Sequence, residues 1–224
     1  MQRAQTEGMV TIPAGSYRVP AAAGGDPVEV TAFAIDRYEV TNGDYRRCLN
    51  RGRCPQPTTP AGETRPNYLL DPAFERFPVV NVDWEAANAF CAFAGKRLPT
   101  AAEWEVAASQ APGMDSLPVY PWGEQFQIQR ANSARTGLGD TQEVGSYRPS
   151  GDSPLGVSDM AGNVAEWTAT NVGRAEGGEE DRFLVKGGSY VDPPANLTIA
   201  FSTPMEASFS APWLGFRCAI ALGE

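Results

Sequence analysis

Histidine is absent from this chain of 224 residues. The absence excludes zinc sites that use histidine, the iron site built from two histidines and a carboxylate, and every Ser-His or Cys-His nucleophile pair. Most familiar hydrolase mechanisms are therefore excluded before any other residue is considered.

Long apolar runs are also absent. No stretch reaches the ~18 uninterrupted apolar residues that a membrane-spanning helix needs, and the N-terminal sequence MQRAQTEG lacks the apolar segment of a signal peptide. We expect no membrane span. The sequence leaves the compartment open: cytoplasmic, or periplasmic or secreted if an N-terminal signal was removed.

Positive charge is scarce, with 18 Lys and Arg against 27 Asp and Glu and a formal net charge of -9. A broad phosphate-binding surface needs clustered cations, so we exclude nucleic acid as a partner. Hydrophobic residues make up 42% of the chain, which suffices for a sizeable core and excludes a disordered chain.

Glycine and proline, by contrast, are abundant, with 23 and 19 residues and no collagen-like period. This composition favours many turns and irregular loops between short elements, and it excludes long helical bundles. The length fits one large domain. We therefore expect a single α+β domain with high coil content.

Local patterns predict the main elements. Alternating apolar and polar residues over 9–17 and 28–38 indicate two strands in a hairpin-like arrangement. Residues 55–78 hold six prolines and no sustained period, which predicts a long loop. Capping residues followed by helical periodicity predict three helices. These helices cover 42–50, 84–94 and 100–109, with caps at Thr41, Asp83 and Thr100.

The four cysteines do not have the paired C-x₂₋₄-C spacing of a zinc site. Cys91 and Cys218 lie in apolar patterns, where a free thiol behaves as a small buried hydrophobic residue. Cys48 and Cys54 flank a short polar run and are close enough for a local disulfide in an oxidising compartment. The sequence does not decide whether that disulfide forms, because it does not give the distance between the Cα atoms.

Several phrases occur in a particular order, among them MVTIPAG, YEVTNGDY, GKRLPTAAEWE, YPWG, GNVAEW, VKGGSY and LGFRC. Together they resemble the formylglycine-generating enzyme family, also called the sulfatase-modifying-factor domain, from about Met9 to Ala219. The resemblance implies a single compact domain related to the C-type-lectin fold. It also implies that the domain covers 9–221 and that 1–8 form an N-terminal tail.

In the founding activity of that family, two cysteines between the GGS and GFR motifs bind copper(I), and dioxygen oxidises a substrate cysteine to formylglycine. Copper(I) prefers soft thiolate ligands. The corresponding segment here, 191–214, contains no cysteine, and an ungapped count places Leu197 and Ser202 where the pair would fall. We therefore do not expect copper. Cys218, within the GFRC motif, looks structural.

Related sulfoxide synthases hold iron with three histidines, and this chain has none.

The resemblance also implies calcium as a cofactor, at the DMAGNVAEW segment. Calcium takes six to eight oxygen ligands from carboxylates and carbonyls in irregular turns. Asp159 and Glu166 can give side-chain oxygens, and Gly162 and Val164 match positions that give backbone carbonyls. The alternative is an Asx-type turn formed by Asp159 and Asn163, with Glu166 exposed.

A second calcium site of the family would use three residues in ANSARTGLGD. These are Asn132, the carbonyl of Ser133, and Asp140. This second site is an expectation from the resemblance.

The segment that forms the substrate cleft in relatives is polar here. Trp213 is a candidate for contact with a peptide, and Lys186 is expected to be a solvated or cleft-edge charge. No nucleophile with an adjacent base can be nominated. The remaining candidate cleft residues are Tyr190, Asp192, Asn196, Ser202 and Glu206.

Three functions remain open. The first is a non-catalytic recognition or scaffold module whose calcium-stabilised loops present a cleft to a protein or peptide partner. The second is an oxygen-dependent metalloenzyme that modifies a cysteine-containing protein, as in formylglycine generation. The third is a secreted lectin-like binder, suggested by the Cys48 and Cys54 pair and the acidic composition. The missing redox cysteines favour the first function.

Overall fold

The computed structural model describes residues 6, 8–20, 27–110 and 117–223. Of the expected tail 1–8, all but Thr6 and Gly8 lies outside the described residues. The described strands are β1 (Met9–Ile12), β2 (Gly15–Tyr17), β3 (Val28–Val30), β4 (Phe33–Asp36), β5 (Ala165–Arg174), β6 (Asp181–Lys186), β7 (Ser202–Glu206), β8 (Leu214–Phe216) and β9 (Ala219–Ala221). The α-helices are α2 (Asn42–Asn50), α3 (Trp84–Phe93) and α4 (Ala101–Ser109).

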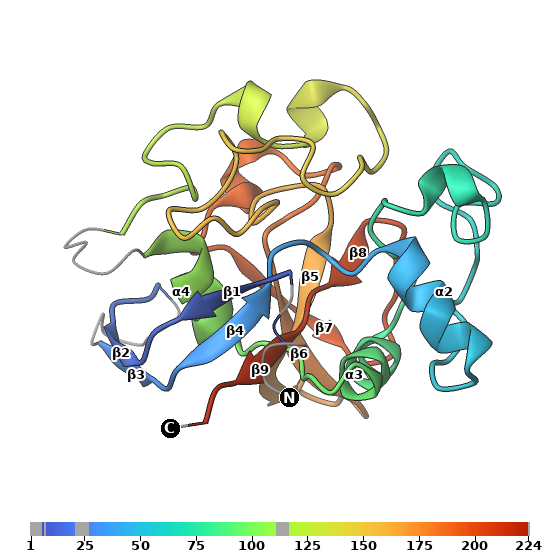
Figure 1. Cartoon of the computed structure of the whole chain (residues 1–224), viewed down its shortest axis with the longest axis horizontal. Coiled ribbons are helices and arrows are strands. Elements are labelled where there is room, and N and C mark those ends of the chain that lie inside the picture. Colours follow the sequence, from blue (N-terminus) through green and yellow to red (C-terminus); the bar gives the residue numbers. More distant parts are fainter. Residues whose placement is uncertain (1–5, 7, 21–26, 111–116, 224) are drawn as a thin grey trace.

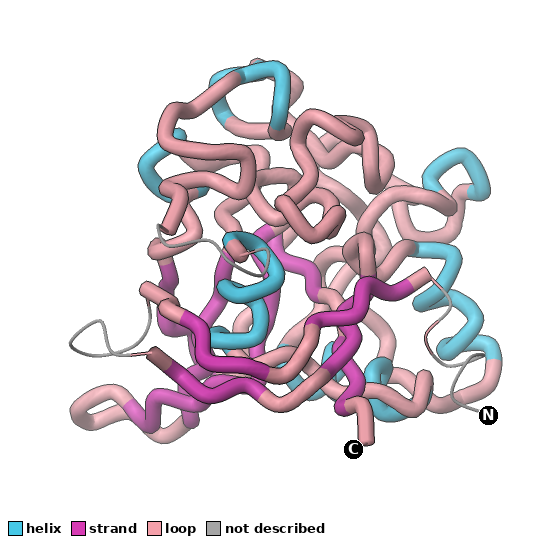
Figure 2. The backbone as a smooth tube through the Cα atoms, turned by 60° about the vertical axis from the view of Figure 1, so that its left-hand side comes forward, coloured by secondary structure: helices cyan, strands magenta, loops and turns pink. Residues whose placement is uncertain are grey.

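Short 3₁₀ helices occur within the long connections: η2 (Pro72–Phe74), η3 (Ile128–Arg130), η4 (Ala134–Thr136) and η5 (Pro194–Leu197). Figure 1 shows α2 and α3 together on one side of the molecule and α4 on the other, with the strands between them. Figure 2 shows how much of the chain is loop, especially above the strands. The expected α+β architecture with high coil content is confirmed.

The N-terminal hairpin is confirmed, although each predicted strand is divided into two. β1 pairs with β4 and β2 pairs with β3, both antiparallel. The first predicted strand is interrupted at Pro13, which has no N–H to donate to a ladder. β9 pairs with the other edge of β4, so the C-terminal strand completes a sheet of order β1-β4-β9.

A second sheet of order β7-β6-β5-β8 forms the other half of the molecule. β5 pairs antiparallel with β6 and parallel with β8, and β6 pairs antiparallel with β7. Trp167 of β5 is fully buried and its Nε1 donates to the carbonyl of Val82 at 3.0 Å. This bond joins the centre of the sheet to the segment that leads into α3.

The three predicted helices are confirmed together with their caps. Thr41 and Asp44 form a reciprocal capping box at α2, and Thr100 and Glu103 form one at α4. Asp83 accepts from the N–H of Ala86 at 2.8 Å at the start of α3. These signals lie within four residues of one another, so sequence alone can define them.

The predicted loop 55–78 is packed against the domain and contains η2, so it is not coil throughout. Tyr68 is only 1% exposed, and its hydroxyl donates to the carbonyl of Pro78 at 2.7 Å. Its ring contacts Phe74 and Phe77 at centroid distances of 5.6 and 6.2 Å. The prolines set the turns, and the aromatic residues between them hold the segment in place.

Two disulfides use all four cysteines. The Cys48–Cys54 disulfide, which the sequence left undecided, is present in the structure. Cys91 and Cys218, expected to be free buried thiols, form a second disulfide with a Cα–Cα distance of 5.6 Å. The expectation failed because the two residues are 127 positions apart, and only the packing of α3 against the C-terminal strands brings them together.

Two large groups of buried side chains form the core. One lies among α2, α3 and the second sheet, and the other between the hairpin and α4. Trp104 and Trp167 are fully buried, and the ring of Trp84 stacks on that of Phe183 with centroids 4.0 Å apart. Across the described ranges, none of the helices is both long enough and apolar enough to cross a membrane.

Candidate functional site

A cavity of about 210 Å³ lies between β7, the start of β5 and the segment that follows β6; we call it the β7 cleft. Three of the six predicted cleft residues line it: Asp192, Asn196 and Trp213. Apolar side chains form much of the rest of its wall, among them Val191, Phe201 and Met205.

The other three predicted residues lie outside the lining of the β7 cleft. Tyr190 is 1% exposed, and its hydroxyl donates to the carbonyl of Pro212 at 3.3 Å. Ser202 and Glu206 are exposed on β7. Because side chains alternate along a strand, the cleft instead receives Thr203 and Met205, the half-buried positions. The alternation was visible in the sequence STPME, but no strand was predicted there.

Hydrogen bonds fix the turn that carries Asp192. One oxygen of the Asp192 carboxylate accepts from the N–H and hydroxyl of Ser189, at 2.9 and 2.7 Å. The other oxygen accepts from the side-chain amide of Asn196 at 2.9 Å. Gly188 has φ of +62°, and a Cβ there would come within 2.5 Å of the Asn196 carbonyl oxygen. The turn therefore requires glycine and is held before any ligand arrives.

The two positions that correspond to the family's redox cysteines are unlike each other. Leu197 is fully buried against Tyr120 and Ala161, whereas Ser202 is exposed at the start of β7. All four cysteines of the chain are in disulfides, so none supplies a free thiol. The copper-thiolate site of the founding activity therefore lacks its ligands in this protein.

Glu166, expected as a calcium ligand, is fully buried and binds protein groups with both oxygens. The guanidinium of Arg217 donates Nε to one oxygen and Nη2 to the other, both at 2.7 Å. The indole N–H of Trp104 also donates to Glu166, at 2.9 Å. The position that a calcium ion would take beside this carboxylate is therefore used by a cation of the chain itself.

Asp159 is also buried, and its carboxylate accepts from the N–H of Gly145 at 2.6 Å. Burial raises the pKa of Asp159 to about 6. Glu39 lies in the same buried cluster: burial and then the charge of Asp159 raise its pKa, although Arg217 opposes the shift. One oxygen of Glu39 has no hydrogen-bond partner. We call Glu39, Asp159, Glu166 and Arg217 the central cluster.

The Asx-type alternative does not describe this segment either. Asn163 adopts φ of +62°, but its side chain makes long-range contacts. Its amide donates to Glu39 at 3.0 Å, and its oxygen accepts from the N–H of Gln142 at 2.8 Å and from Asn132 at 3.3 Å. Glu166 is not exposed. Asn163 therefore joins three separate segments and does not cap a local turn.

The second expected calcium site is also filled by protein donors. One oxygen of Asp140 accepts from the N–H and hydroxyl of Thr64, and Arg65 lies 3.3 Å from the other. Asn132 donates to the carbonyl of Asp140 at 2.9 Å, and the carbonyl of Ser133 accepts from a threonine hydroxyl. The structure thus brings these residues together through hydrogen bonds between protein groups, and these bonds use the oxygens expected to bind calcium.

Among the described residues, no group of three or more His, Cys, Asp or Glu is placed to hold a metal ion. Calcium requires several oxygens directed at one point, and the carboxylates of Glu166 and Asp140 are directed at arginines. The donor set does not fit calcium, so we derive no function through this ion.

Lys186, expected as a solvated or cleft-edge charge, is fully buried. Its ammonium donates to Glu105 at 2.6 Å and to the carbonyl of Ile199 at 2.7 Å. Burial lowers the pKa of Lys186, whereas the neighbouring Glu105 opposes the shift. The expectation was wrong because an isolated lysine in a sequence gives no sign of a partner 81 residues away.

The groups lining the β7 cleft are suited to binding. They include a carboxylate, a side-chain amide, a thioether and an indole, but no imidazole and no thiol. The carboxylate of Asp192 accepts from the hydroxyl of Ser189, but Ser189 is fully buried and does not line the cleft. The lining groups that the structure describes can orient a peptide, and they include no hydroxyl, thiol or imidazole that is hydrogen-bonded to a base.

Comparison with known proteins places this architecture in a family. Residues 1–222 match the family described as "Sulfatase-modifying factor enzyme 1-like domain". The Bos taurus protein "Inactive C-alpha-formylglycine-generating enzyme 2" is 32% identical over an alignment that covers 98% of this chain and 90% of that protein. "Hercynine oxygenase" from Mycobacterium tuberculosis is 35% identical over 64% of this chain and 39% of that protein.

Among solved structures, "Crystal Structure of CarF" superposes with a TM-score of 0.75 and 25% identity, covering 96% of this chain and 98% of that one. The compact fold related to C-type lectins and formylglycine-generating enzymes is thereby confirmed. With the family match spanning nearly the whole sequence, the chain belongs to the sulfatase-modifying factor enzyme 1-like family.

Proposed function

We propose that this protein is a non-catalytic recognition module whose β7 cleft holds an apolar side chain of a peptide or protein partner. The observation that carries the proposal is the cleft itself, a small cavity with apolar walls to which the segment 191–214 contributes most of the lining residues. The cleft contains no thiol.

The chemistry of the rim supports a peptide ligand. Val191 is 48% exposed beside the cleft, and Phe209, 37% exposed, lies with its ring centroid 5.7 Å from that of Trp213. Exposed apolar side chains at a concave site often mark an interaction surface. Asp192 and Asn196 add acceptor and donor groups that can pair with a peptide backbone. A bovine relative named as inactive is consistent with a role in binding alone.

The proposal can be tested with a phage-displayed library of random peptides, followed by affinity measurement on the selected peptides. We expect Trp213→Ala to weaken binding by about 30-fold, because buried tryptophans at the centre of an interface commonly contribute 2 kcal/mol or more. Trp122→Ala is the matched control, since Trp122 lines a different cavity. Thermal melts of both variants check that each remains folded.

Two results would overturn the proposal. One is the absence of any enriched peptide, or an equal loss of affinity in the two tryptophan variants. The other is a chemical change in the ligand: a cysteine-containing peptide incubated with the protein, copper and dioxygen should keep its mass. An oxidised product would favour the alternative of an oxygen-dependent metalloenzyme, which the similarity to a hercynine oxygenase suggests over part of the chain.

A further inference from the structure

A second and larger cavity, of about 430 Å³, lies away from the β7 cleft, between α2, α3 and the segment that follows β4. We call it the α2–α3 pocket. Its volume is in the range of small-molecule sites. The lining residues used here are Arg37, Val40, Arg47, Arg51, Phe90 and Phe93. Glu39 of the central cluster also lines this pocket, whereas none of the described lining residues belongs to the β7 cleft.

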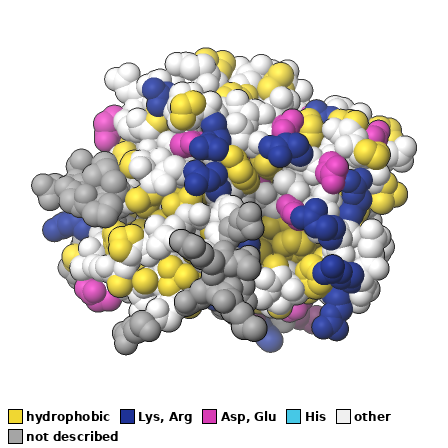
Figure 3. Space-filling view, in the orientation of Figure 1, with side chains coloured by type: hydrophobic (Ala, Val, Ile, Leu, Met, Phe, Trp, Pro, Cys, Tyr) yellow, Lys and Arg dark blue, Asp and Glu magenta, His cyan; other side chains and the backbone are white. Residues whose placement is uncertain are grey.

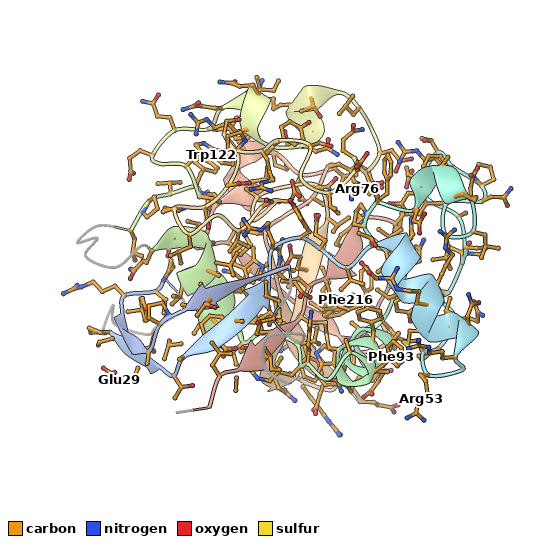
Figure 4. All side chains as sticks on the ribbon, in the orientation of Figure 1. Glu29, Arg53, Arg76, Phe93, Trp122 and Phe216 are labelled. Atoms are coloured by element: carbon orange, nitrogen blue, oxygen red, sulfur yellow. A yellow bond between two sulfur atoms is a disulfide. The ribbon has the colours of Figure 1, made fainter. Side chains whose placement is uncertain are left out.

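The floor of the α2–α3 pocket is apolar and well supported. Val40 and Phe90 are 5% and 7% exposed. The ring of Phe90 stacks on Tyr45 at 5.6 Å and meets Phe216 edge-on at 5.5 Å. In Figure 4, Phe93 is visible on α3, at the same side of the molecule. A floor packed in this way keeps its shape without a ligand.

Both helices that wall the pocket are held by covalent bonds. The Cys48–Cys54 disulfide joins α2 to the turn after it, and the Cys91–Cys218 disulfide joins α3 to the C-terminal strands. Cys91 directly follows Phe90 in the sequence. The pocket is therefore preformed, which lowers the entropy cost of binding.

The rim is richer in cations than the molecule as a whole. The chain carries a net charge of -9, whereas the pocket is lined by four cations, Arg37, Arg47, Arg51 and Lys96, and three carboxylates, Asp36, Glu39 and Asp44. Lys96 pairs with Asp36 at 2.5 Å and Arg47 pairs with Asp44. Figure 3 shows a run of Lys and Arg side chains beside hydrophobic atoms on this side of the molecule.

Arg51 is the cation left for a ligand. It is exposed, and its guanidinium lies over the ring of Phe93 at 5.7 Å from the centroid. Among the described residues, none of the carboxylates forms an ion pair with it. Arg37 is partly used, since one of its nitrogens donates to the carbonyl of Gly156 at 2.8 Å. A guanidinium held over an aromatic ring can still offer its N–H groups to a carboxylate.

We propose that the α2–α3 pocket binds a carboxylate attached to a compact apolar group, with Arg51 pairing with the carboxylate and the apolar group resting on Phe90 and Phe93. Two sources share this chemistry: a free aromatic or aliphatic acid, and the C-terminal residue of a peptide. The proposal does not depend on the function proposed for the β7 cleft.

The test uses pairs of probes that differ in one feature, with binding followed by NMR chemical-shift titration of the whole chain. N-acetylphenylalanine should bind with Kd of roughly 0.1 to 1 mM, and N-acetylphenylalanine amide, which lacks the charge, about tenfold more weakly. N-acetylalanine should bind more weakly than N-acetylphenylalanine because it leaves the apolar floor uncovered. Binding of 3-phenylpropionate as tight as that of N-acetylphenylalanine identifies free acids as ligands, and weaker binding identifies peptide C-termini.

Arg51→Gln is the decisive variant, and Arg53→Gln is its matched control. Arg53 is exposed two residues further on and does not line the α2–α3 pocket; its side chain is labelled in Figure 4. We expect Arg51→Gln to remove the roughly tenfold preference for the acid over the amide, and Arg53→Gln to leave it unchanged. Three results would overturn the proposal. The unmodified protein could bind the acid and the amide equally, or both variants could lose the preference for the acid to the same extent. The third is that no probe binds up to about 10 mM.

Discussion

The central cluster, which includes Glu166 of β5, and the β7 cleft, which the same sheet helps to form, differ in how their polar groups are used. In the cluster, Arg217 is fully buried and donates five hydrogen bonds, two to Glu166 and three to backbone carbonyls. In the cleft, half-buried and exposed side chains surround an open cavity. The motifs GNVAEW and GFR, which identify the family, supply Glu166 and Arg217 of the cluster. They identify the fold and not the activity.

The difference matters for interpreting other members of the family. A chain can keep every residue of the cluster and still lack the redox cysteine pair, because that pair belongs to a separate segment. Here that segment has become η5 and β7 with an apolar cleft between them. The predictions on Arg217, on Glu39 and on calcium test whether the cluster is purely structural, and the largest expected effect comes first.

Replacing Arg217 by methionine should have the largest effect. Arg217→Met leaves Glu166 buried beside Asp159 and Glu39 without a cation, and removal of one partner of a buried ion pair costs about 3–5 kcal/mol. We expect a loss near 5 kcal/mol because three carboxylates share this cation. Chemical denaturation measures the loss, provided that the variant folds.

Arg174→Met is the control for this prediction, since Arg174 makes an exposed ion pair with Asp181 at 3.3 Å. The unfolding free energy of Arg174→Met should be lower than that of the parent protein by no more than about 1 kcal/mol. Arg217→Lys, which keeps the charge but loses the two-pronged contact with Glu166, should fall between the two. A structural role for the cluster is contradicted if the two methionine variants are equally stable.

The two disulfides should differ in their contributions to stability. The Cys91–Cys218 bond closes a loop with sequence separation 127 and the Cys48–Cys54 bond one with separation 6. In the chain-entropy description a longer loop gives more stabilisation, so we expect the unfolding free energy to fall by about 5 kcal/mol without the first bond and by about 2 kcal/mol without the second. The comparison is between the double variants Cys91→Ala/Cys218→Ala and Cys48→Ala/Cys54→Ala in denaturant titrations.

Equal losses in those titrations would mean that local packing, and not loop closure, sets the contribution of each bond. The Cys48–Cys54 variant has a second readout. If that disulfide holds the wall of the α2–α3 pocket, its removal should weaken binding of N-acetylphenylalanine.

Sequence information predicted what depends on neighbours along the chain. The helices at 42–50 and 100–109 are defined by capping boxes within four residues, and the structure has both. Three of the six predicted cleft residues line the β7 cleft: Asp192, Asn196 and Trp213. Ser202 and Glu206 were chosen from the face of β7 that points away, because without a predicted strand the alternation of STPME was not used.

What sequence could not supply is the identity of distant partners. Glu166 resembles a calcium ligand until Arg217, 51 residues later, is seen to occupy both of its oxygens. Lys186 resembles a surface charge until Glu105 is found against it. Buried charges are stable only when paired, and the partner is known only once the chain has folded.

Glu39 has one carboxylate oxygen without a hydrogen-bond partner. We expect its ionisation to have a smaller effect on stability than the changes above, and this effect depends on pH. The folded-state pKa of Glu39 is raised by burial, so the native state holds this proton where the unfolded chain has released it. Stability therefore falls as pH rises above the unfolded pKa of about 4.3. Glu39→Gln removes the ionisation, so the melting temperature of the variant relative to the parent should rise between about pH 5 and about pH 8, by about 3 °C.

Glu103→Gln should have the opposite sign. Burial alone would raise the pKa of Glu103, but hydrogen bonds from Arg97 at 2.7 and 2.5 Å and from Thr100 hold it below its ordinary value. Its contribution is present above the unfolded pKa, so the variant should lose stability at about pH 8 and less at lower pH. If the stability of both variants relative to the parent protein changed in the same direction with pH, the pKa of Glu39 would not be raised by burial.

The smallest expected effect concerns calcium. Because arginines occupy the carboxylates of Glu166 and Asp140, we expect the melting temperatures with about 10 mM calcium and with EGTA to agree within about 1 °C. A weak site with Kd of about 1 mM would raise stability by RT ln(1 + [L]/Kd), about 1.4 kcal/mol, or some 3 °C or more. Such a rise would restore the expectation drawn from the family resemblance. It would also mean that Arg217 or Arg65 moves aside for the ion, and repeating the melt with Arg217→Lys and with Arg65→Lys would identify which carboxylate the ion takes.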